Sequence, residues 1–455
     1  MNMGSLIASK IAMFRGSRIL RENTSNAAYG VAEYLAQGLA MLAAASFLVH
    51  RLGLSQYGLW MLASAIMGGM ESLSSGFGDA TIKFVSKYRG RNDWTGVERI
   101  IRATLAINGA LGSLLAAFVI LGSRFAVTHI FKIEPQQHEL SVRMLQIAGI
   151  TLLLHSLDNV FANTLRAYEQ YGRTVKISIT TRWLNVVAAV VLVYLGYSVL
   201  AIMWASLAIA VVSLILQGAA VRSVCGPIIL LPQIDRDSMR EIFGFGVFSW
   251  IQALAGVIFY NADRLVVGAV MGTSALGIYA VCVQASQPIH GITAAALNFV
   301  FPHISARHEA GESYTLRRVF RAATWANIGF VAFLSAPLIL FSRPILALWM
   351  GPSFAEQGYV VLTWLALANA CLGACVASHY VLLALGQARF VASVNVLGGV
   401  LALGCIALLM PHYGLLGAAI GRLLYAAAAT MNFWKLHTLR LDVPVPLGTV
   451  RENEI

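Results

Sequence analysis

Charged and amide side chains lie inside long apolar stretches of this chain, in positions that would suit ligand binding or proton transfer. A charge near the centre of a bilayer costs at least about 2.5 kcal/mol, so within a membrane span such groups face a cavity or pair with one another. Cations there can bind an anion such as phosphate, and a carboxylate can take up a proton because burial favours its neutral form. The candidate binding residues are Glu71, Asp79, Lys83, Arg182, Asp263, Arg264, Gln284, Gln287, Asn298 and Arg422, and the candidate ion-coupling residues are Glu33, Asp79 and Asp158.

Some of these residues also fit structural ion pairs. Asp79 and Lys83 are one helical turn apart, in the favourable order of acid before base. Asp263 and Arg422 form a second candidate pair, on different spans. For each of these four residues, the sequence leaves a structural and a ligand-binding role open.

Glu71 and Arg264 favour ligand binding, because neither has an obvious partner on its own helix. Lys83 and Arg182 are predicted near one face of the membrane, and Arg264 lies toward the other. Cations at both depths suit a substrate that carries phosphate charge.

The elements that position these residues are predicted to be transmembrane helices. Of the 455 residues, 58% are hydrophobic and only 11% are charged, and the mean hydropathy is +0.73, which excludes a water-soluble fold. A helix needs about 20 apolar residues to cross a bilayer, where isolated strands cannot satisfy their backbone. Twelve spans are predicted, at residues 26–50, 58–86, 98–121, 143–165, 176–195, 198–221, 244–271, 274–303, 319–341, 358–385, 390–411 and 415–437.

The positive charge is distributed unevenly between the two sides of these spans. The formal net charge is +12, which by itself would also be typical of a nucleic-acid-binding protein. However, 23 Lys and Arg residues lie in the N-terminal segment, in the loops on its side or in the span ends that adjoin them, and five lie on the opposite side. This asymmetry places both termini in the cytoplasm and argues against a nucleic-acid partner.

The two halves of the chain are similar at a constant offset of 219 residues. Gly53 and Gly58 recur as Gly272 and Gly277 without a gap. Each half holds six spans, an even number, so both copies insert with the same orientation and form two lobes around a central cavity. Further matched pairs are Glu33 and Gln252, Asp79 and Asn298, Ser86 and Ser305, Arg99 and Arg318, Arg102 and Arg321, Asn108 and Asn327, and Arg124 and Arg343.

The predicted organisation has five parts. Residues 1–25 form a cytoplasmic amphipathic segment, because basic and apolar side chains alternate along it. The remaining parts are an N-lobe at 26–221, a cytoplasmic linker at 222–243, a C-lobe at 244–437 and a cytoplasmic tail at 438–455. Outer turns are predicted at Gly196, Gly272 and Gly414, which leave no room for an outer catalytic domain.

Enzymatic and metal-binding motifs are not found in the sequence. A Walker A motif is absent, and Gly76-Phe77-Gly78 lacks the third glycine of a dinucleotide fingerprint. The histidines do not have the spacing of metal ligands. No catalytic residue, metal or cofactor is therefore predicted, and the energy for transport must come from an ion gradient or from consumption of the product.

The chain resembles the Wzx-type flippases, the polysaccharide transporter branch of the multidrug/oligosaccharidyl-lipid/polysaccharide exporter superfamily. The resemblance covers residues 26–437. In the second half it rests on Asp263-Arg264-Leu-Val-Val-Gly268, Gly272, Gly277-Ile-Tyr279, Pro288 and Pro302-His-Ile-Ser305. In the first half it rests on Leu52-Gly53, Tyr57-Gly58 and the run from Gly76 to Tyr88.

This resemblance implies twelve helices in two six-helix lobes, with spans 1, 2, 7 and 8 lining a cavity that opens alternately to the two sides. It also implies a cargo of oligosaccharide on undecaprenyl diphosphate, moved to the periplasmic leaflet of the inner membrane for O-antigen, capsule or exopolysaccharide assembly. Polymerase or ligase partners and a monomeric state are further expectations.

Two other functions are compatible with parts of the sequence. A proton- or sodium-coupled multidrug exporter would share the fold, but its cavity should be dominated by carboxylates, whereas acids and bases are nearly balanced here. An oligosaccharide polymerase or glycosyltransferase would need a large loop for its sugar site. The longest loops between the predicted spans have about 20 residues, which argues against a membrane enzyme.

Overall fold

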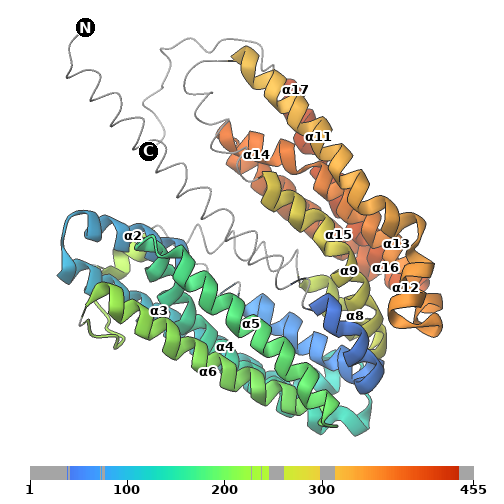
Figure 1. Cartoon of the computed structure of the whole chain (residues 1–455), viewed down its shortest axis with the longest axis horizontal. Helices are drawn as coiled ribbons and strands as arrows, with labels where there is room; N and C mark the ends of the chain where they lie inside the picture. Colours follow the sequence, from blue (N-terminus) through green and yellow to red (C-terminus); the bar gives the residue numbers. More distant parts are fainter. Residues whose placement is uncertain are drawn as a thin grey trace. The chain divides into compact units, whose positions relative to one another are not determined.

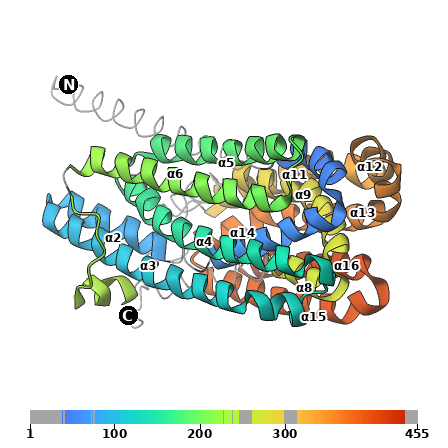
Figure 2. The ribbon, with the colours of Figure 1, turned by 90° about the horizontal axis from the view of Figure 1, so that it is seen from below.

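The computed structural model describes residues 38, 41–71, 73, 77–226, 228–236, 238–244, 261–297 and 313–439. Within these ranges the chain is helical and contains no strand (Figures 1 and 2). Eight helical segments there are long and apolar enough to cross a membrane. The all-α membrane fold is confirmed, and the count of twelve spans stays a prediction. Glu33, Asn298, the segment 1–25 and the tail beyond 439 lie outside the described residues.

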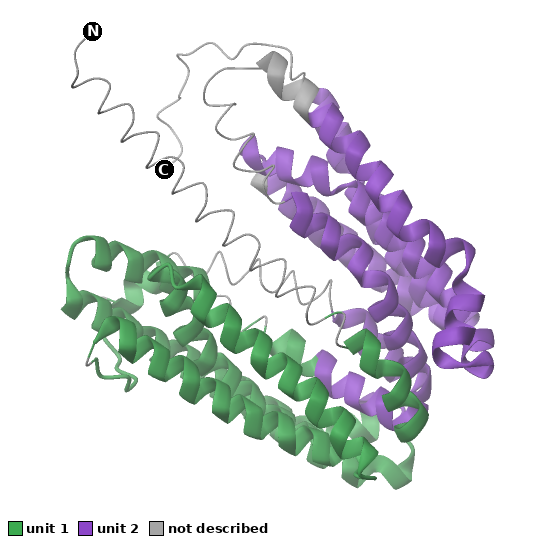
Figure 3. Ribbon diagram, viewed as in Figure 1, with its two compact units in different colours: residues 1–52, 66–129, 134–254 green, residues 53–65, 130–133, 255–455 purple. Residues whose placement is uncertain are grey.

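The chain divides into two compact units (Figure 3). Unit 1 comprises Met1–Leu52, Ile66–His129 and Glu134–Leu254, and unit 2 comprises Gly53–Ala65, Ile130–Ile133 and Ala255–Ile455. Two short segments of the first half, 53–65 and 130–133, therefore cluster with the second half. The predicted boundaries of the lobes and the linker stay a prediction.

Unit 1 is a helical bundle in which α3, α4 and α6 pack closely (Figure 2). The helix α3 begins after Asp93, whose carboxylate accepts hydrogen bonds from the Gly96 N–H at 2.8 Å and from the Thr95 hydroxyl. These bonds lower the pKa of Asp93, as expected for a helix N-cap. The helices are α2 (Gly78–Gly90), α3 (Trp94–Phe125), α4 (His138–Ala167), α5 (Tyr171–Tyr194) and α6 (Val199–Cys225), preceded by helical residues 41–71.

The described part of unit 2 includes both long helices and several short ones. The predicted tight turn at Gly272 is confirmed, with φ +88°, and so is the one at Gly414, with φ +57°. In unit 1 the predicted turn at Gly196 likewise has φ +85°, a backbone conformation that glycine adopts without strain. The helices of unit 2 are α8 (Ala262–Met271), α9 (Thr273–Leu297), α11 (Ser313–Leu340), α12 (Ser342–Met350), α13 (Pro352–Ala374), α14 (Val376–Ala384), α15 (Ala388–Tyr413), α16 (Leu415–Ala429) and α17 (Met431–Thr438).

The predicted span 358–385 consists of two helices, α13 and α14, which meet at Cys375. A buried side chain from another helix explains the break. The Asn327 amide nitrogen, on α11, donates to the carbonyl oxygens of Gly373 at 2.9 Å and Ala374 at 3.3 Å. These carbonyls are thus satisfied by a side chain at the point where the helical ladder is interrupted.

Replacing Asn327 with Leu should destabilise the protein by about 1–3 kcal/mol, because it removes the donor from two buried backbone carbonyls. The equivalent residue of the first half, Asn108, is a matched control. It is also buried, but its amide donates only to Thr104 of its own helix. Thermal unfolding of the purified variants should show a larger loss of stability for Asn327→Leu than for Asn108→Leu. Equal losses of stability would contradict this explanation.

Two repeated glycines lie at a close helix crossing inside unit 2. A Cβ added to Gly58 would overlap the Thr273 carbonyl oxygen, and one added to Gly277 would lie 2.7 Å from the Leu54 carbonyl oxygen. Leu54 and Thr273 are themselves 219 residues apart, so the contact is reciprocal. This reciprocity is what a two-fold axis between the duplicated segments produces. The small residues allow the two backbones to touch.

Alanine at Gly58 or Gly277 should destabilise the fold by about 1–3 kcal/mol, because the extra methyl group has no space at either crossing position. Gly122 of α3 provides the control, since a Cβ added there would have no atom within 4 Å. Gly122→Ala should leave the melting temperature unchanged or raise it, because alanine favours the helix. If all three variants have the same melting temperature, the crossing does not constrain the fold.

The linker after α6 is bound to the end of α2. Lys87 and Tyr88 of α2 both donate hydrogen bonds to the Glu241 carboxylate. Burial alone would raise the pKa of Glu241, but these two bonds outweigh it and lower that pKa. The linker is therefore held to α2 by specific contacts.

Candidate functional site

A buried ion pair lies at the centre of a polar cluster in unit 2, which we call the Asp263 cluster. Asp263 is 3% exposed and lies in the first turn of α8. The Arg422 Nε, from α16, lies 2.9 Å from the Asp263 Oδ2, and the Tyr279 hydroxyl of α9 donates to the same oxygen at 2.7 Å. The predicted pair of Asp263 with Arg422 is present, and a tyrosine completes it.

Arg264 is left with a weaker partner by this arrangement. Its Nη2 donates to the Gln287 Oε1 at 3.4 Å, and its Nε is buried without a hydrogen-bond partner among the described residues. Asp263, the adjacent carboxylate, is already bound by Arg422 and Tyr279. The cluster contains one acid and two guanidinium groups, so it carries one excess positive charge.

A second pair of polar side chains extends the cluster. The Tyr57 hydroxyl donates to the Gln284 Oε1 at 3.1 Å, and the Gln284 amide nitrogen lies 3.2 Å from the Met61 Sδ. Tyr57 is fully buried, and the Arg264 charge acts on it electrostatically. Arg264 is thus accompanied by the hydroxyl and amide dipoles of Tyr57, Gln284 and Gln287, which can orient toward a bound anion.

Arg422→Gln should destabilise the protein by about 3–5 kcal/mol, because it leaves the Asp263 charge buried without its cation. The double variant Asp263→Asn with Arg422→Gln should recover part of this loss, since neither charge remains. Arg343→Gln is the control, because its pair with Glu356 is exposed and should contribute under about 1 kcal/mol. Thermal unfolding checks the series, and an Arg422→Gln variant that melts like Arg343→Gln would contradict it.

Unit 1 contains a separate group of titratable side chains, the Glu71 cluster. Glu71 lies in the helical stretch 41–71, and its Oε2 is 3.7 Å from the His155 Nδ1 of α4. The charge of Arg182, on α5, acts on both Glu71 and His155. Three helices thus bring together an acid, an imidazole and a guanidinium group.

Asp158 lies one helical turn after His155 on the same face of α4. The Ser213 hydroxyl of α6 donates to its Oδ2 at 3.2 Å, and its Oδ1 is buried without a hydrogen-bond partner among the described residues. The charges of His155 and Glu71 both act on Asp158. A partly satisfied carboxylate near an imidazole and another carboxylate is a chemically suitable place for a proton.

The predicted residues of α2 belong to neither cluster. Asp79 and Lys83 are both exposed, and the described structure shows no ion pair between them. The Lys83 Nζ instead lies 5.4 Å from the centre of the Phe84 ring, a distance that suits a cation–π contact. Of the two predicted ion pairs, the described structure thus contains the Asp263–Arg422 pair of unit 2.

Tyr57, Tyr279 and His155 are not among the candidate residues predicted from the sequence. The two tyrosines appear there only in the motifs of the family resemblance, yet both are fully buried and make polar contacts. The available signal was position: each lies close to Gly58 or Gly277, at the crossing that brings the two repeats together. His155 lies three residues before Asp158, a spacing that places both on one helical face.

Among the described residues, no group of three or more His, Cys, Asp or Glu side chains is arranged to hold a metal ion. The fold and the two clusters define a multi-pass helical membrane protein with ionisable groups inside each of two repeated units.

Comparison with known proteins identifies the class. A family model described as "Polysaccharide biosynthesis protein" matches residues 52–358, and the chain belongs to this family. The chain is 21% identical over 406 residues to a Shigella flexneri protein named "Putative O-antigen transporter", covering 87% of this chain and 93% of that protein. It is 22% identical over 331 residues to the "Uncharacterized membrane protein EpsK" of Bacillus subtilis (strain 168), covering 70% of this chain and 65% of the relative.

Solved structures show the same fold at low sequence identity. An inward-facing multidrug resistance MATE family transporter of the MOP superfamily superposes with a TM-score of 0.73 at 18% identity, covering 89% of this chain and 94% of that one. A MOP superfamily transporter from Pyrococcus furiosus gives a TM-score of 0.62 at 17% identity, covering 92% and 95%. The chain therefore has a MOP-type transporter fold, and the prediction that it is not an enzyme agrees with relatives described as transporters.

Proposed function

We propose that the chain is a flippase that moves an oligosaccharide on undecaprenyl diphosphate from the cytoplasmic to the periplasmic leaflet. The family and the transporter fold support the class, and the name of the Shigella flexneri relative, an O-antigen transporter, supports the cargo. A sugar headgroup cannot cross about 30 Å of hydrocarbon unaided. Polar side chains inside the protein can replace its water while the prenyl tail stays in lipid.

The observation that carries this proposal is the excess positive charge of the Asp263 cluster. Arg422 neutralises Asp263, so Arg264 keeps its charge with only the Gln287 amide oxygen as a side-chain partner among the described residues. A guanidinium group with available donors inside a membrane protein binds a phosphate group well. We propose that Arg264 holds the diphosphate during translocation, with Gln284 and Gln287 contacting the adjoining polar groups.

We propose that Lys83 and Arg182 meet the diphosphate before it reaches Arg264. Both lie in unit 1, where Lys83 is exposed on α2 and Arg182 acts on the Glu71 cluster. Because 23 cations are on the side of the N-terminus, we place that side in the cytoplasm and the protein in the bacterial inner membrane. Polymerase or ligase partners and the monomeric state stay predictions.

The Glu71 cluster supports coupling to an ion gradient. We propose that Asp158 carries a proton, because its Oδ1 is buried without a hydrogen-bond partner in the described structure and its neighbours His155 and Glu71 also titrate. Asp79, the other described candidate, is exposed. Alternating access driven in this way would need no cofactor.

Arg264→Gln should weaken diphosphate binding about 10- to 100-fold and slow translocation accordingly at limiting substrate, because a charge-assisted hydrogen bond contributes about 1.5–3 kcal/mol. The measurement is translocation of a labelled prenyl-diphosphate oligosaccharide in liposomes that contain the purified protein. Lys83→Ala should also slow translocation. Arg343→Gln, which removes an exposed and paired guanidinium group, should translocate at the wild-type rate.

A wild-type rate for both Arg264→Gln and Lys83→Ala would remove these residues from the proposed path. The same liposomes test the alternative of a cation-coupled multidrug exporter, which the carboxylates Glu71 and Asp158 would also suit. Strong proton- or sodium-dependent efflux of a cationic dye, without translocation of the oligosaccharide, would favour the exporter.

A further inference from the structure

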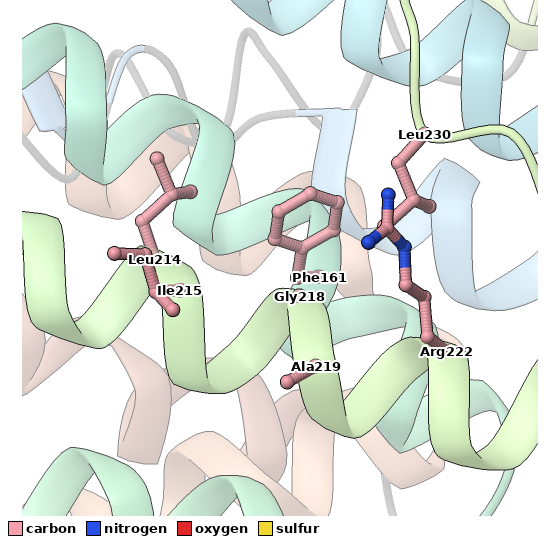
Figure 4. Close-up of a pocket in the computed structure, with 7 residues that line it drawn as sticks. All are labelled: Phe161, Leu214, Ile215, Gly218, Ala219, Arg222 and Leu230. Atoms are coloured by element: carbon pink, nitrogen blue, oxygen red, sulfur yellow. The ribbon is translucent and has the colours of Figure 1, made fainter.

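A groove on unit 1 is distinct from both polar clusters. It has a volume of about 510 Å³ and lies between α4, α6 and the linker (Figure 4). Phe161 of α4 forms its floor against Gly218 of α6, where an added Cβ would lie 3.3 Å from the ring. Leu214 lies toward one end of the groove, and Arg222 and Leu230 lie toward the other.

The wall of the groove formed by α6 is suited to hydrocarbon. This helix is the most apolar of the eight candidate spans, and its Ile215 side chain is 63% exposed. From Leu214 to Arg222 the helix axis rises by about 12 Å. This length is close to the depth of one leaflet, which is half of the roughly 30 Å core. An acyl chain therefore fits the groove in both length and polarity.

Arg222 gives this apolar groove a cationic end. It lies in the last turn of α6 with its side chain exposed, and the described residues provide no carboxylate partner for it. Figure 4 shows its side chain extending from α6 toward Leu230, beside the Phe161 ring. A second guanidinium group lies nearby, since the Arg173 Nη1 donates to the Ser223 Oγ at 3.0 Å. An apolar groove that ends at the Arg222 guanidinium group, with Arg173 bound to the next residue of α6, matches an anionic lipid.

The linker, which forms the third wall, is fixed along α3 by hydrogen bonds. The Arg102 Nε donates to the Leu231 carbonyl oxygen at 3.1 Å, and the Gln233 N–H donates to the Arg102 carbonyl oxygen at 3.2 Å. The Ile229 N–H donates to the Glu98 Oε1 at 3.3 Å. These bonds hold the backbone on both sides of Leu230, the linker residue that closes the groove.

The linker also presents apolar side chains outward. Leu231 and Ile234 are 66% and 76% exposed, although the backbone beside them is hydrogen-bonded to α3. Exposed aliphatic side chains beside a basic helix end are typical of a segment that lies at the membrane surface. The groove therefore opens where a lipid headgroup would be expected.

We propose that the groove binds a phospholipid with an anionic headgroup. One acyl chain lies along α6 against Phe161 and Gly218, and the headgroup phosphate lies at Arg222. The bound lipid then joins α6 to the linker, so it stabilises the position of the linker beside α6. This inference does not depend on the cargo of the transporter.

The test is native mass spectrometry of the full-length protein, purified in a neutral detergent and titrated with phosphatidylglycerol or phosphatidylcholine. The wild type should retain one phosphatidylglycerol in preference to phosphatidylcholine. Arg222→Gln should weaken phosphatidylglycerol binding about fivefold, the typical contribution of one Arg near an anionic membrane surface. Ala219→Phe, at an exposed position on the groove wall, should displace both lipids by filling the groove.

Arg91→Gln is the matched control, because it removes an exposed cation from the loop after α2, outside the groove. It should leave lipid binding unchanged. Equal binding of the two lipids by the wild type, wild-type binding by both groove variants, or an equal loss in Arg91→Gln would each overturn the proposal. Circular dichroism of each variant confirms that a loss of lipid does not reflect unfolding.

Discussion

The cost of placing a charge in hydrocarbon governs the arrangement of polar side chains in both units. Asp263 is nearly inaccessible to solvent, and it is held by a guanidinium group from α16 and a hydroxyl group from α9. This pairing draws three helices together and fixes the start of α8. Because Arg422 and Tyr279 occupy this carboxylate, the Arg264 side chain donates to Gln287 instead.

The two units meet this constraint in different ways. In unit 2 the Asp263 carboxylate is paired with Arg422, and the positive charge of Arg264 is not balanced by a second carboxylate in the cluster. Unit 1 brings Glu71, His155 and Asp158 together, groups that can also respond to the constraint by changing their protonation. A duplicated fold has thus acquired different chemistry in its two copies, which is compatible with anion binding in one and proton transfer in the other.

The duplication also explains why small residues recur where backbones meet. Gly58 and Gly277 are equivalent in the repeat and lie against each other's segment, so each copy depends on the other for its close approach. Tyr57 and Tyr279 are buried beside this crossing and extend from it into the Asp263 cluster. The crossing that packs the two repeats together therefore also positions these polar groups.

The sequence by itself determined the membrane class, the duplication, the turns at Gly196, Gly272 and Gly414, and the Asp263–Arg422 pair as one alternative. The membrane class and the turns follow from the local sequence, the duplication follows from the constant offset of 219 residues, and the ion pair follows from the cost of an unpaired charge in a membrane. Only the tertiary structure decided that His155 lies beside Glu71 and that Asn327 binds the break between α13 and α14. Contacts between helices depend on their crossing angles and rotation, which hydrophobic periodicity within one helix does not specify.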